Sequence, residues 1–116
     1  MKNLRTLLIS MLFLLPAAAM AQKPAMNMTQ AMPLSPASKE YMSGMQNMHH
    51  GMMQAMKEQD ADRAFAKGMA EHHKGAIAMA ETELKYGKDP EMRKMAEDVI
   101  KAQKAEIEQL EKWLKK

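Results

Sequence analysis

Methionine and histidine are the residues of this sequence whose types and spacing could do chemistry. The chain of 116 residues contains 16 Met and 4 His, but no Cys. The lack of Cys excludes disulfides, thiolate zinc sites, iron–sulfur clusters and cysteine nucleophiles. Thioether sulfur suits Cu(I) and, by the same softness, Ag(I), and imidazole binds copper as well. The composition therefore predicts a binding site for a soft metal ion.

The spacing of these residues is typical of chelation on a helix. Met69 precedes His72 by three residues and His73 by four, and Met45 precedes His49 by four. Side chains three or four residues apart are neighbours on a helix surface and can hold one ion. The predicted metal ligands are Met45, Met48, His49, Met52, Met69, His72, His73 and Met79.

Two polar residues interrupt the apolar stripe of the C-terminal segment. Gln103 and Glu106 occupy positions where Leu or Ile would pack better. A buried polar group without a partner costs about 1–3 kcal/mol. We therefore expect these two side chains to form hydrogen bonds that orient a ligating histidine ring. Met92 and Met95 lie in the same stripe, and we expect them to fill the core.

The pattern around these residues predicts three helices, over about 35–58, 60–86 and 89–116. Ser35, Asp60 and Asp89 are suitable N-caps, and Gly87 is suited to ending the second helix. No stretch alternates as a strand does. Because the connections are short, neighbouring helices should be antiparallel. The predicted fold is an all-α, up-down antiparallel bundle of three helices.

The N-terminal part has a different character. Residues 1–21 have the basic start, short apolar middle and small-residue cleavage site of a signal peptide. Residues 22–34 read as a flexible tail, whose Met residues serve either as linker or as a metal-capture arm. The bundle then spans 35–116, and we expect it in the periplasm, free of the membrane after signal cleavage. The formal charge of +3 includes Lys2 and Arg5 of the signal, so nucleic acid is a poor candidate partner.

Two runs of sequence, Phe65 to Ala80 and Ala102 to Ile107 with the following Trp113-Leu114, resemble the domain of unknown function 305 family. The resemblance implies a ferritin-like helical bundle, exported in bacteria, with members linked to copper or silver binding and resistance. It carries over Met69, His72, His73 and Met79 as metal-site candidates, and Gln103 and Glu106 as motif positions. Longer members carry two copies of the helical unit, whereas the first copy here is degenerate and richer in Met. The ligands expected before residue 53 therefore rest on composition alone.

The leading functional hypothesis is a non-catalytic periplasmic protein that binds Cu(I) or Ag(I). It would buffer the metal or deliver it to a copper exporter or another periplasmic copper protein. One alternative is a structural or interaction module, in which the Met surface binds partner helices. A second alternative, a ferritin-like iron oxidase, is disfavoured because few inward carboxylates are available: Asp62, Glu83 and Glu106. Wide apolar faces on only three helices are also compatible with a homodimer.

Overall fold

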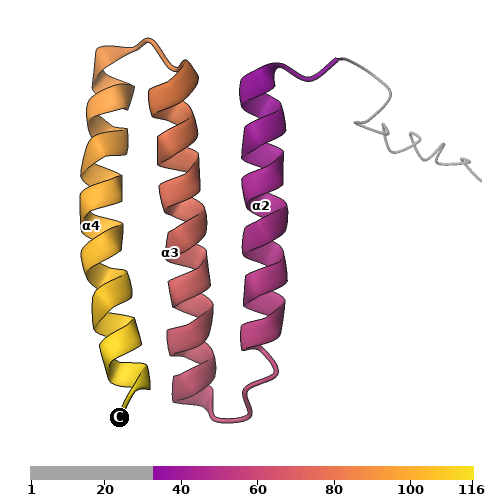
Figure 1. Ribbon diagram of the computed structural model, residues 1–116, viewed down its shortest axis with the longest axis vertical. Coiled ribbons are helices and arrows are strands. Elements are labelled where there is room, and N and C mark those ends of the chain that lie inside the picture. The colour runs from indigo at the N-terminus through magenta and orange to yellow at the C-terminus, as the bar shows by residue number, and fades with distance from the viewer. Residues whose placement is uncertain (1–32) are drawn as a thin grey trace, which may run out of the picture. The chain divides into compact units, whose positions relative to one another are not determined.

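Three helices form the part of the protein that the structure describes, residues 33–116 of the computed structural model. They are α2 (Pro36–Ala55), α3 (Ala61–Tyr86) and α4 (Pro90–Leu114), and this part of the chain contains no strand. Successive helices are antiparallel and joined by short connections (Figure 1). The all-α, up-down arrangement is thereby confirmed. The predicted signal peptide, and the tail up to residue 32, lie outside the described residues.

Local capping explains where the helices begin. The side chains of Ser35, Asp60 and Asp89 each accept a hydrogen bond from the backbone N–H three residues later, at 3.1, 2.9 and 2.9 Å. These are the predicted N-caps. Gly87 is the C-cap of α3, with an extended backbone conformation. Arg93 of α4 reaches back and donates to the carbonyls of Leu84 and Gly87, at 2.8 and 3.0 Å, which satisfies the end of α3.

The first helix is shorter than the sequence predicts. It ends at Ala55, whereas its pattern predicts an end near Glu58. Glu58 instead lies in the connection, where its carboxylate pairs with Lys67 and, at 3.5 Å, with Arg63 of α3. Glu58 thus binds the next helix instead of extending α2.

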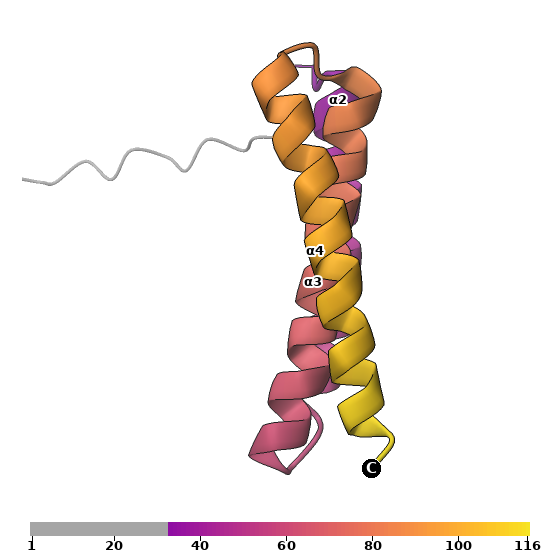
Figure 2. The ribbon, with the colours of Figure 1, turned by 90° about the vertical axis from the view of Figure 1, so that its left-hand side faces the viewer.

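The helices form a single layer with α3 in the middle. α3 packs against both α2 and α4, while α2 and α4 do not contact each other. Seen from the side, α4, α3 and α2 lie one behind the other (Figure 2). The buried apolar positions within the described residues are small, and no large side chain of this part of the chain is completely buried. The buried apolar residues are Ala55, Ala66, Ala70, Ala80 and Ala96.

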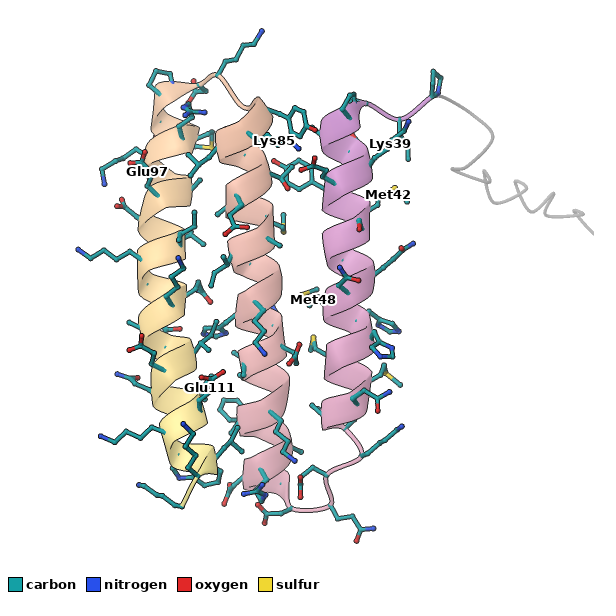
Figure 3. The ribbon with its side chains drawn as sticks, viewed as in Figure 1. Lys39, Met42, Met48, Lys85, Glu97 and Glu111 are labelled. Carbon is teal, nitrogen blue, oxygen red and sulfur yellow. The ribbon has the colours of Figure 1, made fainter. Side chains whose placement is uncertain are left out.

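Glycines allow α2 and α3 to approach closely. A Cβ atom added to Gly75 of α3 would lie 2.9 Å from the Cβ of Met48, closer than non-bonded carbons tolerate. Met48 extends from α2 toward α3 and fills this space (Figure 3). At Gly44 an added Cβ would instead lie 3.5 Å from the Cβ of Ala78, an ordinary contact. Of these two glycines, Gly75 therefore marks the closer approach between the helices.

The two faces of the layer differ in character. On α3, one face carries large or apolar residues at helical spacing: Phe65, Met69, Ala76 and Met79. The cavities that these residues line are also lined by residues of α2 or α4, so the face extends over all three helices. We call this the apolar face. The opposite side of α3 carries charged residues: Arg63, Lys67, Lys74, Glu81 and Lys85. No helix of residues 33–116 has both the length and the apolar character needed to cross a membrane.

Ion pairs link α3 to its N-terminal neighbour at both ends of their interface. One end involves α2 itself, and the other involves the connection between α2 and α3. Lys85 of α3 pairs with Glu40 of α2, and Tyr86 donates to the same carboxylate at 2.8 Å. The Lys85 and Tyr86 hydrogen bonds lower the pKa of Glu40, and the Lys67 hydrogen bond lowers the pKa of Glu58, both from the ordinary value of 4.5. Both carboxyl groups therefore favour the folded state when ionised.

This linkage predicts an acid-sensitive α2–α3 interface. A carboxyl whose folded pKa is lowered stabilises the fold fully above its unfolded pKa, near 4.5 here, and loses that contribution as the pH falls through the lower folded pKa. Thermal unfolding from pH 7 to pH 3 should show a falling midpoint below about pH 4.5. The double variant Glu40→Gln/Glu58→Gln should start from a lower midpoint at pH 7 and lose less on acidification. If the unfolding midpoints of the two proteins fell equally with pH, Glu40 and Glu58 would not be the source of the acid sensitivity.

Candidate metal site

His73 is the only histidine of residues 33–116 that is buried, with 7% of its surface exposed. It lies on the side of α3 that packs against α4. Its Nε2 atom pairs with the Oε2 atom of Glu106 on α4. The carboxylate side chain is 53% exposed, so water solvates its remaining lone pairs. Glu106 thus forms a hydrogen bond with a histidine ring, as the sequence predicts, whereas its role toward a metal ion stays a prediction.

The hydrogen bond to Glu106 determines what the other ring nitrogen can do. An ionised carboxylate only accepts hydrogen bonds, so the Nε2 atom that faces it carries the hydrogen. In the neutral ring, Nδ1 then keeps a free lone pair. Nδ1 of His73 is buried and has no hydrogen-bond partner. A carboxylate–histidine pair with a free, oriented nitrogen is the arrangement that proteins use to present imidazole to a metal ion.

A cavity of about 330 Å³ adjoins this pair on the apolar face. Met69, His73 and Glu106 line it together, which brings a thioether, an imidazole and a carboxylate to one place. Gln103, one turn before Glu106 on α4, has a buried Oε1 atom that also lacks a hydrogen-bond partner. Unpartnered buried polar atoms are uncommon and costly. Of these two residues, His73 lines the cavity and Gln103 does not, so the unpartnered Nδ1 atom of His73 is the one that fits a site completed by a cation.

His72 is not part of this buried pair. The sequence predicts both histidines on the inner face, but His72 is exposed. Consecutive residues are about 100° apart on a helix, so only one of the two can point into the α3–α4 interface. Their ring centroids lie 6.0 Å apart in an edge-to-face arrangement. His72 therefore lies outside the lining of this cavity, at helical spacing from Met69 and Ala76 on the apolar face.

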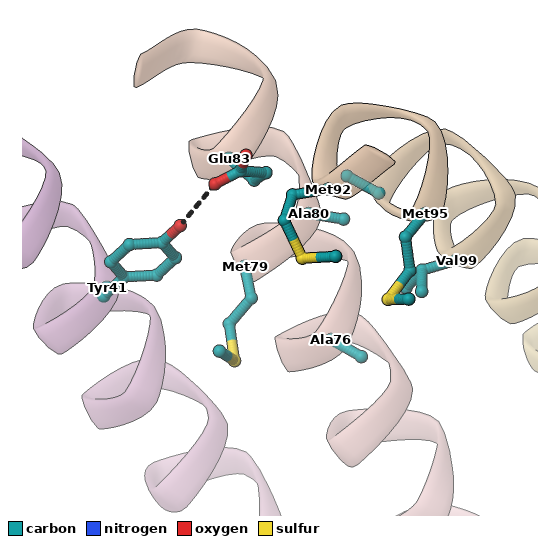
Figure 4. A pocket seen from close by; sticks show the side chains of 9 residues that line it. Tyr41, Ala76, Met79, Ala80, Glu83, Met92, Met95 and Val99 are labelled. Atoms are coloured by element: carbon teal, nitrogen blue, oxygen red, sulfur yellow. Dashed lines mark hydrogen bonds between the residues drawn. The ribbon is translucent and has the colours of Figure 1, made fainter. Parts of the chain in front are cut away.

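Met79 lines a second cavity, of about 350 Å³, farther along α3 (Figure 4). Two methionines of α4, Met92 and Met95, line the same cavity. The expectation that these two fill the core is wrong, because both are exposed in a layer that leaves this face uncovered. The cavity thus gathers three thioethers from two helices. The sequence signal that could have identified it is the Met92-x-x-Met95 spacing.

Tyr41 closes the far side of this second cavity. Its hydroxyl donates to Glu83 of α3 at 3.5 Å (Figure 4). Burial, and then the neighbouring Glu83 charge, raise the pKa of Tyr41 above its ordinary value of 10.0. The phenol therefore stays neutral at physiological pH and acts as a hydrogen-bond donor.

The expected ligands on α2 are not gathered into one site. Met48 packs against Gly75 in the α2–α3 interface. Met45 and His49 are exposed, and Met52 is half-buried. α2 makes no contact with α4, which carries Glu106. The structure therefore brings together Met69, His73 and Glu106, and it places the α2 residues elsewhere.

Oxygen and nitrogen ligands alone do not cluster here. Among residues 33–116, no group of three His, Asp or Glu side chains is arranged to hold one ion. The candidate site instead combines His73 and Glu106 with the sulfur of Met69.

Comparison with known proteins gives one finding. The model of a family described as Domain of unknown function (DUF305) matches residues 9–114, nearly the whole chain. The search of curated proteins found no match.

Proposed function

Since the chain belongs to the domain of unknown function 305 family, whose description states no activity, we propose that it is a non-catalytic binding protein for Cu(I) or Ag(I). The observation that carries this proposal is the free Nδ1 atom of His73. The ring is held by Glu106, beside the thioether of Met69. Imidazole and thioether together suit a soft, monovalent ion better than a hard one.

The exposed sulfur atoms support exchange rather than permanent storage of the ion. Met79, Met92 and Met95 line an open cavity on the same face as Met69. Thioethers are neutral, flexible ligands, and one can replace another without a change in charge. We propose that this row of sulfur atoms accepts the ion and passes it to a partner, such as a copper exporter or another copper protein. The signal-like segment makes the periplasm the proposed location, where a Cys-free site avoids disulfide formation.

The ferritin-like arrangement implied by the resemblance stays a prediction, because one chain supplies a single layer of three helices within residues 33–116. The exposed Met residues also favour the second candidate function, an interaction module without metal. Replacing the sulfur and nitrogen donors distinguishes the two functions. Metal binding requires them, whereas an apolar surface tolerates the replacement of Met by Leu.

A competition titration tests the proposal. Purified protein is titrated with Cu(I), and separately with Ag(I), against a chromogenic chelator. We expect the protein to compete at micromolar concentration, and the double variant Met69→Leu/Met79→Leu to bind each ion at least about 10-fold more weakly. Met42→Leu, on α2 and outside both cavities, is the matched control and should bind as the parent does.

Two results would overturn the proposal. One is the absence of any competition with the chelator. The other is equal affinity in the parent and the double variant, which would leave the interaction module as the better reading of the exposed Met residues.

A further inference from the structure

We propose that a second copy of the chain covers the apolar face, around a two-fold axis that passes close to His72. The inference rests on the shape and polarity of the layer and needs no metal. It therefore goes beyond the proposed metal binding and can fail or succeed separately from it.

The layer is incomplete as a folded unit. Helical domains bury their apolar stripes between at least two packed layers. Within residues 33–116 the helices supply one layer, α2 and α4 do not meet, and no large side chain is completely buried. A chain of this kind needs a cover on the face where its large apolar side chains lie.

The exposed area matches what a dimer requires. Five large apolar side chains that line the cavities of this face, and two of α2 and its C-cap at helical spacing from Tyr41, are 39–64% exposed. A large side chain has about 200 Å² of surface, so these seven expose about 700 Å². That exceeds the largest patch of an ordinary monomer, about 300–600 Å², and approaches the roughly 800 Å² that each partner buries in a standard interface. The seven are Met45, Met56, Phe65, Met79, Met92, Met95 and Trp113.

The apolar face is self-complementary in shape. Near one end, Phe65 projects with 64% of its surface exposed, beside Trp113 of α4. Toward the other end lies the cavity of about 350 Å³ lined by Tyr41, Met79 and Met95 (Figure 4). In a dimer, the Phe65 ring of each copy can enter the cavity of the other copy. The same contact is then made twice, as an isologous interface requires.

The position of the axis follows from the helix. Phe65 and Met79 are 14 residues apart on α3, about 21 Å at 1.5 Å per residue. A two-fold axis that places Phe65 of each copy on the Met79 cavity of the other passes midway between them, at His72. Ala76, which follows this midpoint by one turn on the face, is small and permits close approach on that side. His72 of one copy then faces His72 of the other.

The distribution of charge favours a second copy over a lipid surface. Helices that bind membranes carry Lys and Arg beside the apolar stripe. Here the basic residues of α3 lie on the opposite side, whereas the carboxylates of Glu83 and Glu106 border the cavities of the apolar face. In the dimer the charged sides of both layers remain in water.

Light scattering on the metal-free, chelator-treated protein tests the interface. We expect a particle of twice the chain mass at micromolar concentration. Phe65→Asp should raise the dimer dissociation constant at least about 100-fold and give monomers with unchanged helical content. Met53→Asp is the matched control: it also places an acid at an exposed apolar position, but on the side of α2 turned away from α3. This control should remain dimeric.

The absence of cysteine allows a direct test of the axis. His72→Cys would introduce the only thiol of the chain. Under mild oxidation we expect a disulfide-linked dimer at low protein concentration, since residues at a two-fold axis reach the short separation that a disulfide needs. Met53→Cys should link far more slowly. A monomeric parent protein would overturn the proposal, as would a dimer insensitive to Phe65→Asp, or equal linking of the two Cys variants. A monomer that binds phosphatidylglycerol vesicles would show that lipid covers the face instead.

Discussion

Replacing His73 with leucine is expected to weaken binding of Cu(I) or Ag(I) about 100-fold while making the metal-free protein more stable. The affinity falls because the substitution removes the one buried, unpartnered side-chain nitrogen of residues 33–116. The stability rises because leucine has a similar size and removes the unpartnered Nδ1 atom from the α3–α4 interface. Glu106 loses its partner, but its side chain is 53% exposed and is hydrated instead.

The two effects are measured on the same variant. Competition titration gives the affinity, and thermal unfolding of the metal-free protein should show a midpoint about 4–8 °C higher, equivalent to about 1 kcal/mol for a domain of this size. His50→Leu is the control, since His50 is exposed on α2 and should change neither quantity. A His73 variant that binds metal normally, or one that unfolds at a lower temperature, would show that the buried ring serves packing rather than a ligand.

Adding one methyl group at Gly75 is expected to destabilise the fold by about 1–2 kcal/mol. The new Cβ of Gly75→Ala would lie 2.9 Å from the Cβ of Met48, so α2 must move away from α3. Overpacking of this kind destabilises a fold by about 1–3 kcal/mol. The better helix propensity of alanine offsets about 0.5–1 kcal/mol of this loss.

Gly44→Ala provides the matched comparison. Its new Cβ would meet Ala78 at 3.5 Å, an ordinary distance, so the propensity gain should appear almost undiminished as about 0.5–1 kcal/mol of added stability. Chemical denaturation of the two variants beside the parent protein gives both values. Equal effects of the two substitutions would mean that α2 does not pack on α3 at the distance described here.

Local features of this protein could be predicted from its sequence because they depend on neighbouring residues alone. Ser35, Asp60 and Asp89 cap helices through their own backbone, and the short connections allow only antiparallel neighbours. The pairing of Glu106 with a histidine could be anticipated for a similar reason, since a carboxylate in an apolar stripe requires a partner.

Features that depend on where the helices are placed could not be predicted in this way. A helical wheel puts His72 and His73 on one broad face, and only the position of α4 decides that His73 is buried. The same wheel makes Met92 and Met95 appear to be core residues, whereas the missing cover leaves them exposed. Which glycine lies against Met48 is equally invisible to periodicity, because it depends on the register between two helices.

The central position of α3 has a consequence for how the protein comes apart. Each outer helix is held by one neighbour, so the energetics resemble those of a short linear array, in which stability is a sum of nearest-neighbour terms. Release of α2 breaks the glycine contacts and the pairs of Glu40 and Glu58 with α3, yet it leaves the α3–α4 hairpin whole. His73 and Glu106 both belong to that hairpin. A bound ion would therefore anchor the more persistent half of the molecule, and amide hydrogens of α2 would exchange with solvent first.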